Sequence, residues 1–233
     1  MNSSIPQKIL VVAAHPDDEI LGCGASIKKW TVAGAEAYAL ILAQGIASRV
    51  SESSLSISEK ISMLQSDSIS AARIIGYNEV FFEQFPDNRM DSVDLLDVIQ
   101  RVEKYIMKIK PTTILTHHNG DLNIDHQITY RSVVTACRPI SDSTIKSIYS
   151  FQIPSSTEWS FPYHQSTFSP NTFVDVTETI FAKTEALACY KSEIREAPHP
   201  RSPEILEAIA RQWGSVVNVN YAEALELIYT IIH

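Results

Sequence analysis

Cysteine is scarce in this chain of 233 residues, which contains only Cys23, Cys137 and Cys189. The three are too few and too scattered for a disulfide framework, and none has the Cys-x-x-Cys spacing of a structural zinc site. A long hydrophobic run near the N-terminus is absent too, since the apolar run there covers only residues 9–14. We therefore expect no signal peptide and no membrane span, and a cytoplasmic protein with buried thiols.

Positive charge is also in short supply, because 19 lysines and arginines stand against 27 aspartates and glutamates, a net charge of −8. This balance argues against nucleic acid or an anionic membrane surface as the main partner. Two common motifs are missing as well. No Gly-x-Gly-x-x-Gly follows a strand, which disfavours a nicotinamide enzyme, and no Gly-x-Ser-x-Gly elbow indicates a serine hydrolase.

Short apolar runs alternate with helical patterns along the chain. Ser56 and Glu59 form a capping box at the start of one helix, Gly76 ends that helix, and Pro111 ends the next. The expected strands are 9–14, 37–43, 80–83, 113–116, 145–153 and 173–176, and the expected helices are 21–30, 56–76, 93–110, 127–136 and two that begin at Thr177 and Ser202. The alternation predicts one domain, residues 1–233, with a three-layer α/β fold and a mainly parallel, Rossmann-like sheet.

The densest group of polar side chains is Ala-His-Pro-Asp-Asp-Glu at residues 14–19. It follows the first expected strand and lies at the edge where open α/β sheets bind ligands. Across a tight turn, the His15 imidazole and the Asp18 carboxylate can reach one zinc ion, which leaves Asp17 as the candidate general base. The alternative is a turn whose aspartates only cap the following helix.

A second polar segment, residues 116–126, follows the expected strand 113–116. Because parallel strands bring their carboxyl ends side by side, His126 can supply the third ligand that a catalytic zinc needs. Asp125 stands beside it as a carboxylate able to fix the geometry of the site. His117 and His118 are expected to support the site from the loop rather than to bind the metal.

The motif at residues 15–19, with Asp125 and His126 downstream, resembles the PIG-L/LmbE-like family of zinc-dependent N-deacetylases, which act on N-acetylglucosamine-type sugars. Residues 85–89 resemble the family's substrate-binding loop, and residues 199–204 and 221–224 are similar to bacterial members. The resemblance covers nearly the whole chain. It implies His15, Asp18 and His126 as ligands of Zn²⁺, Asp17 as general base, and Arg89 as a contact to the sugar or its attached group.

Asn123 departs from the family pattern. Many members carry His-Pro-Asp-His where residues 123–126 read Asn-Ile-Asp-His, and the first histidine is taken to stabilise the oxyanion or to protonate the leaving amine. An asparagine amide can donate a hydrogen bond to an oxyanion but cannot deliver a proton. The proton donor is then Asp17 acting twice, or a histidine elsewhere. The candidate histidines are His118, His164 and His199.

The predicted reaction removes the acetyl group from a small-molecule N-acetylated amino sugar, whether free, nucleotide-linked, lipid-linked or part of a glycoconjugate. Asp17, Asn123 and Asp125 are the candidate catalytic residues. Arg89, His118 and His199 are the candidate substrate contacts, although a solvated Arg89 and an ordinary connecting loop around His199 are the alternatives. Two rival hypotheses stay open: a zinc amidohydrolase of a non-sugar amide, and a sugar-binding relative without turnover. A homo-oligomer is also left open.

Overall fold

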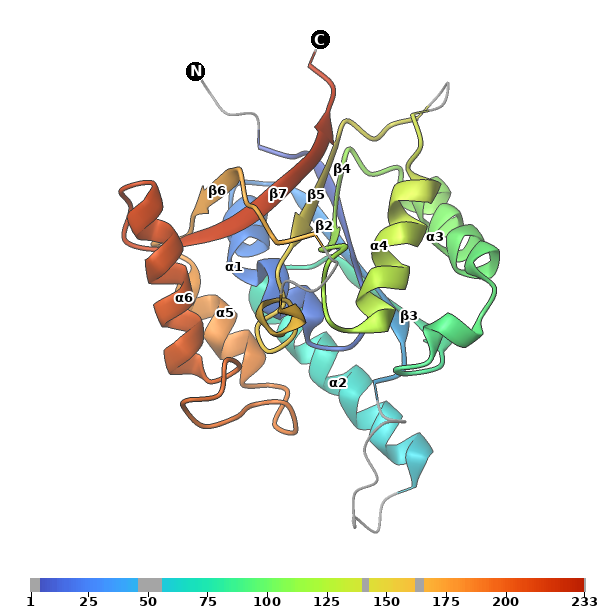
Figure 1. Ribbon diagram of the computed structural model, residues 1–233, viewed down its shortest axis with the longest axis horizontal. Helices are drawn as coiled ribbons and strands as arrows, with labels where there is room; N and C mark the ends of the chain where they lie inside the picture. The colour runs from blue at the N-terminus through green and yellow to red at the C-terminus, as the bar shows by residue number, and fades with distance from the viewer. Residues whose placement is uncertain (1–4, 46–55, 140–142, 162–165, 233) are drawn as a thin grey trace.

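A seven-stranded sheet forms the centre of the molecule (Figure 1). The computed structural model describes residues 5–45, 56–139, 143–161 and 166–232. Within these ranges, no helix is both long enough and apolar enough to cross a bilayer. The strands are β1 (Lys8–Ala13), β2 (Glu36–Ala43), β3 (Glu79–Phe85), β4 (Thr113–His117), β5 (Ser147–Phe151), β6 (Thr172–Asp175) and β7 (Ala222–Thr230).

The strand order is β3-β2-β1-β4-β5-β7-β6. Strands β1 to β5 pair in parallel, whereas β7 runs antiparallel to both of its neighbours. The order reverses between β1 and β4, because the chain moves outward to β2 and β3 on one side and to β5 on the other. Ligands bind beside such a reversal, outside the carboxyl ends of the strands. The predicted, mainly parallel α/β sheet is confirmed, and its reversal point lies at the two polar segments.

Helices cover both faces of the sheet (Figure 1). In β1, Ile9 and Val11 pack toward α1, α2 and α5, while Leu10 and Val12 pack toward α3 and α4. Because both faces are covered, β1 is buried and apolar from Ile9 to Ala13, and three layers result. The helices are α1 (Asp18–Val32), α2 (Ile57–Ile75), α3 (Leu95–Ile109), α4 (Ile124–Ala136), α5 (Ile180–Leu187) and α6 (Pro203–Val216), with short 3₁₀ turns η1 (Met90–Ser92) and η2 (Glu158–Ser160).

Capping side chains start α2 and α4, whereas the Asp17 side chain makes no capping bond at the start of α1. The predicted capping box of α2 is present, because Ser56 and Glu59 each accept the other's backbone N–H with a side-chain oxygen. Helices α1 and α4 begin three residues earlier than predicted, at Asp18 and Ile124. The Asn123 side chain accepts the backbone N–H of Asp125 at 2.8 Å and so caps α4. The early starts place the polar motif residues on rigid first helical turns.

Strand β7 is the element that the sequence does not indicate. Its sequence contains two glutamates, which are disfavoured in strands. Glu223 is nevertheless buried, because the Lys183 ammonium lies 2.6 Å from it and the backbone N–H groups of Ala25 and Ser26 donate to it at 3.2 and 2.6 Å. These partners come from α1 and α5, so only the folded structure explains this buried carboxylate.

Gly22 allows α1 to approach β5 closely. A Cβ atom at this position would overlap the Phe151 ring, with Cε2 at 2.6 Å, whereas a Cβ at Gly24 would meet its nearest neighbour, Ile20 Cγ2, at 3.2 Å. We expect Gly22→Ala to lower the free energy of unfolding by about 1–3 kcal/mol through overpacking. Gly24→Ala is the matched control in the same helix. Equal denaturation midpoints and slopes for the two variants would contradict this close approach.

Candidate metal centre and active site

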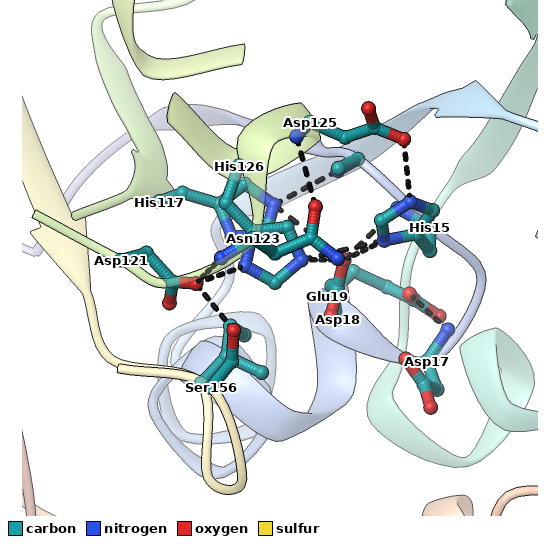
Figure 2. A network of polar contacts seen from close by, with 12 residues as sticks. His15, Asp17, Asp18, Glu19, His117, Asp121, Asn123, Asp125, His126 and Ser156 are labelled. Carbon is teal, nitrogen blue, oxygen red and sulfur yellow. Dashed lines mark hydrogen bonds and ion pairs between the residues drawn. The ribbon is translucent and has the colours of Figure 1, made fainter. Parts of the chain in front are cut away.

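Three side chains from the two polar segments meet at the carboxyl ends of β1 and β4 (Figure 2). Asp18 Oδ2 lies 3.3 Å from His15 Nδ1 and 3.3 Å from His126 Nε2, and those two nitrogens are 3.3 Å apart. The three residues thus form a group whose possible ligand atoms all lie within 4.8 Å of one another. The structure therefore brings together the complete predicted ligand set, from segments more than 100 residues apart in the chain.

The three residues fit a divalent metal ion. Two imidazoles and one carboxylate are a common donor set of catalytic zinc. Asp18 is fully buried, and its Oδ1 atom has no hydrogen-bond partner among the described residues. A buried carboxylate oxygen without a partner is costly unless a cation satisfies it. The site thus contains a donor set suited to a divalent ion and a carboxylate oxygen that such an ion would satisfy.

The two histidines compensate this negative charge when no metal is bound. Burial alone would lower their pKa, but hydrogen bonds with Asp125 and Asp18 raise the pKa of His15 to about 10. For His126, the charges of Asp18 and Asp121 likewise outweigh burial and raise the pKa to about 9. A metal ion must displace these protons, so metal binding weakens as the pH falls.

Each ligand histidine has a further carboxylate at its other ring nitrogen. His15 Nε2 lies 2.9 Å from Asp125 Oδ2, and His126 Nδ1 lies 3.0 Å from Asp121 Oδ1. Such carboxylates fix the tautomer and orientation of a metal-binding imidazole. Asp125 therefore supports the ligand of the other segment rather than its neighbour His126. Asp121 is a residue that the sequence analysis missed, and its only signal was its position in the same polar segment.

The segment at residues 85–89 reaches the centre through its backbone. Asp125 accepts the backbone N–H of Asn88 at 2.6 Å and that of Met90 at 2.9 Å. Asn88 has a φ of 53°, in the left-handed region that asparagine adopts more readily than most residues. In addition, Asp87 Oδ1 lies 3.3 Å from His15 Nε2. The predicted substrate-binding loop thus also holds the carboxylate that orients a metal ligand.

Asp17 stands next to the ligands in a strained conformation. Its φ of 101° lies in the left-handed region, which non-glycine residues rarely adopt, and its side chain is almost fully buried. Glu19 accepts the backbone N–H of Asp17 at 3.0 Å (Figure 2). It also accepts a hydrogen bond from the Tyr190 hydroxyl. Burial raises the pKa of the Asp17 carboxyl, and the Arg201 guanidinium, 2.8 Å away, opposes that shift.

A cavity of about 120 Å³ opens over this group. Asp17, His15 and His126 line it together with Asn123 and residues from distant parts of the chain. The Asn123 side-chain nitrogen donates to Asn88 Oδ1 at 3.0 Å, which orients the amide at the edge of the cavity. Asp87 and Asn88 on the cavity wall come from the loop at residues 85–89, and Arg201 comes from the segment 199–204. Lining residues outside the segments singled out in the sequence are Gly45, Leu64, Ser155, Ser156 and Glu193.

The three predicted substrate contacts do not line this cavity in the described part of the chain. Arg89 is exposed on the surface. His118 is buried, with Nδ1 2.9 Å from Glu226 Oε2 and Nε2 2.8 Å from the Ser166 carbonyl oxygen. His199 is half-buried, and its Nδ1 accepts the backbone N–H of Arg201 at 3.1 Å. Their contacts with substrate stay predictions, and His164 lies outside the described residues.

His117 supports the centre, as expected. Its Nε2 accepts the backbone N–H of Ala14 at 2.8 Å, and its ring stacks on His126 with 4.0 Å between centroids. Burial holds the pKa of His117 well below its ordinary value, so the ring is neutral. A neutral ring that accepts this N–H ties the end of β1 to the end of β4 and keeps the two polar segments in register.

Comparisons with known proteins agree with this geometry. The family model described as GlcNAc-PI de-N-acetylase (PIG-L) matches residues 10–137, more than half of the chain. A relative in Escherichia coli K12, described as "Uncharacterized deacetylase YaiS", is 30% identical over 190 residues, which cover 79% of this chain and 90% of that protein. The family match includes both polar segments, residues 14–19 and 116–126.

Solved structures share the fold. The N,N'-diacetylchitobiose deacetylase of Pyrococcus horikoshii has a TM-score of 0.78 at 20% identity, over 96% of this chain and 84% of that one. The 4-carboxy-2-hydroxymuconate hydratase GalB of Pseudomonas putida KT2440 has a TM-score of 0.77 at 21% identity, over 97% and 98%. Since a hydratase has the same fold, the fold alone does not identify the activity. The activity follows from the family match. By that match, together with the convergence of its two motifs, this chain belongs to the PIG-L family of metal-dependent N-deacetylases.

Proposed function

We propose that this protein hydrolyses the N-acetyl group of a small amino sugar, with Zn²⁺ held by His15, Asp18 and His126. The observation that carries the proposal is the meeting of these three residues beside Asp17 at the base of one cavity. When bound, zinc lowers the pKa of a coordinated water from ~15.7 to roughly 7 and polarises the substrate carbonyl.

Asp17 is the proposed general base. It lines the cavity beside the ligand His15, so its carboxylate can take a proton from the attacking water. As the C–N bond breaks, the same carboxyl returns the proton to the leaving nitrogen, and the products are acetate and a free amine. No second titratable group is needed, which suits a chain with Asn123 where many relatives have histidine.

Asn123 is the proposed donor to the oxyanion. An amide nitrogen has two hydrogens, and the hydrogen bond to Asn88 uses one of them. The other can point to the carbonyl oxygen as negative charge develops on it. Because Asn123 also caps α4, the amide is held by the start of a helix rather than by a flexible loop.

Polar groups in the cavity support a sugar as the substrate. Asn88, Ser155 and Ser156 line it, and amide and hydroxyl groups suit the hydroxyls of a saccharide. The rival substrate class is a non-sugar amide, since the reaction centre specifies the bond and not the acyl carrier. Acetate release from a panel of free, nucleotide-linked and lipid-linked N-acetyl sugars, with simple N-acetyl amines alongside, decides between the two.

Metal binding depends on the three ligands. We expect about one divalent ion per chain, reversible loss of activity on chelation, and loss of both metal and activity in His15→Ala and His126→Ala. Elemental analysis of the purified variants measures this, with His199→Ala, a half-buried histidine outside the ligand set, as the control that keeps its metal. Full metal content in either ligand variant would refute the assignment.

The proposed roles of Asp17 and Asp18 can be distinguished by how each substitution affects metal content and kcat. Asp17→Asn keeps the metal but lowers kcat by about 10² to 10⁴, the usual contribution of a general base. Asp18→Asn loses metal instead, because it removes a ligand charge. Metal content and acetate release are measured on the same preparations, and the opposite pattern would exchange the two roles.

The role of Asn123 can be separated from its capping role. Asn123→Ala removes both the amide donor and the helix cap, whereas Asn123→Ser keeps an oxygen able to cap α4. We expect both variants to lower kcat by about 10 to 10³ through loss of an oxyanion donor. Only the alanine variant should also lower the melting temperature. Full activity of Asn123→Ser would show that the amide is not needed in the reaction.

A further inference from the structure

Arg201 occupies a fixed place at the edge of the cavity. It directly precedes Ser202, whose side chain accepts the backbone N–H of Ile205 at 3.2 Å and so starts α6, with Pro203 as the first helical residue. Its own backbone N–H donates to His199 Nδ1 at 3.1 Å. The start of the helix and the preceding turn therefore fix where the Arg201 side chain begins.

The guanidinium group is held on two sides. Nη1 donates to Asp17 Oδ2 at 2.8 Å, and Nε donates to Ser155 Oγ at 2.9 Å. Glu193 Oε2 also lies 3.5 Å from Nη1, and the side chain is only 18% exposed. Because the guanidinium is planar and its donors point in fixed directions, contacts at two nitrogens determine its orientation.

Asp17 needs such a partner. Its carboxylate is buried near those of Asp18 and Glu19, and like charges at short range favour rotation of the side chain away from them. The strained backbone fixes the Cα of Asp17 but not the rotation about its side-chain bonds. A charge-assisted hydrogen bond from Arg201 to one carboxylate oxygen orients the group and leaves the other oxygen for the water.

We propose that Arg201 is a positioning residue that holds the Asp17 carboxylate in the orientation for proton transfer. This inference rests on the proposed function, in which Asp17 is the base. A misplacement of about 1 Å can cost 10²-fold in rate, so loss of the guanidinium should lower kcat by about 10- to 100-fold. The rival role is a direct contact with substrate, which would raise KM and act independently of Asp17.

The first experiment needs no substrate. Melting temperatures of the wild type, Asp17→Asn, Arg201→Ala and the double variant form a cycle. We expect the double variant to lose less than the sum of the two single losses, with metal content retained in all four proteins. Additive losses would overturn the contact between the two residues. The control is Arg195→Ala, which removes an arginine whose side chain donates to the backbone carbonyls of Ser192 and Ile194.

The second experiment uses the best substrate of the panel. We expect Arg201→Ala to change KM by no more than about twofold, and to lower kcat little further when Asp17→Asn is already present. Added guanidinium ion should restore at least part of the rate of Arg201→Ala, but none of the rate of Asp17→Asn. Multiplied losses in the double variant, or a raised KM without rescue, would overturn the proposal.

Further variants distinguish failure of the positioning role of Arg201 from failure of the proposed function. Arg201→Lys carries the same kinetic test where Arg201→Ala does not fold, because lysine keeps the charge but cannot hold both Asp17 and Ser155 with a planar group. If Asp17→Asn alone retained full activity, the proposed base would be wrong whatever Arg201 does. If Asp17→Asn is inactive but Arg201→Ala and Arg201→Lys are fully active, the proposed function stands and the positioning role fails.

Discussion

Buried negative charge is the constraint on which this site depends. Asp17, Asp18, Glu19, Asp121 and Asp125 are all at most 2% exposed, within one small region. Carboxylates in an apolar interior are unfavourable unless cations and hydrogen-bond donors compensate them. Backbone N–H groups, hydroxyls and one guanidinium supply part of that compensation. The rest falls to the His15 and His126 imidazoles, whose pKa values are raised by the neighbouring carboxylates.

The sheet makes this concentration of charge possible. Parallel strands β1 and β4 end side by side. Helix α1 then begins at Asp18 itself, and α4 begins at Ile124, two residues before His126. Helix N-termini favour negative charge, so the first turns of α1 and α4 suit the carboxylates placed there. The order of the strands, rather than any single loop, therefore brings the residues of the site together.

The meeting of His15, Asp18 and His126 could be predicted from the sequence because the polar motifs are dense and local. His15 and Asp18 follow a clear apolar strand, and His126 follows another, so strand order alone brings them together. The support of each ligand could not be predicted in the same way. Asp125 lies beside His126 in the chain but contacts His15, since its position on the first turn of α4 directs it across the sheet edge.

Long-range pairs limited the rest of the prediction. Arg201 and Asp17 are separated by 184 residues, and no periodicity in the sequence relates them. Strand β7 could not be predicted for a related reason. Its buried Glu223 is paired with groups of α1 and α5, which are distant in the sequence. Helix starts were misjudged where the capping residue also belonged to a motif, as with Asn123. For Arg201 and Glu223 the partner that determines the role lies far away in the sequence, whereas the Asn123 cap bonds to Asp125, only two residues on.

The cavity is built by two separate portions of the chain. The three proposed metal ligands, and the carboxylates beside them, fall within residues 10–137, the part that matches the family model. The lining residues Ser155, Ser156, Glu193 and Arg201 come from the later portion that contains the antiparallel strand. Substitutions in that later portion can reshape what the cavity accepts without touching a metal ligand. Arg201, which contacts Asp17, is the exception, so the rest of this portion can change while the proposed reaction centre stays the same. One reaction can in this way serve different substrates on one fold.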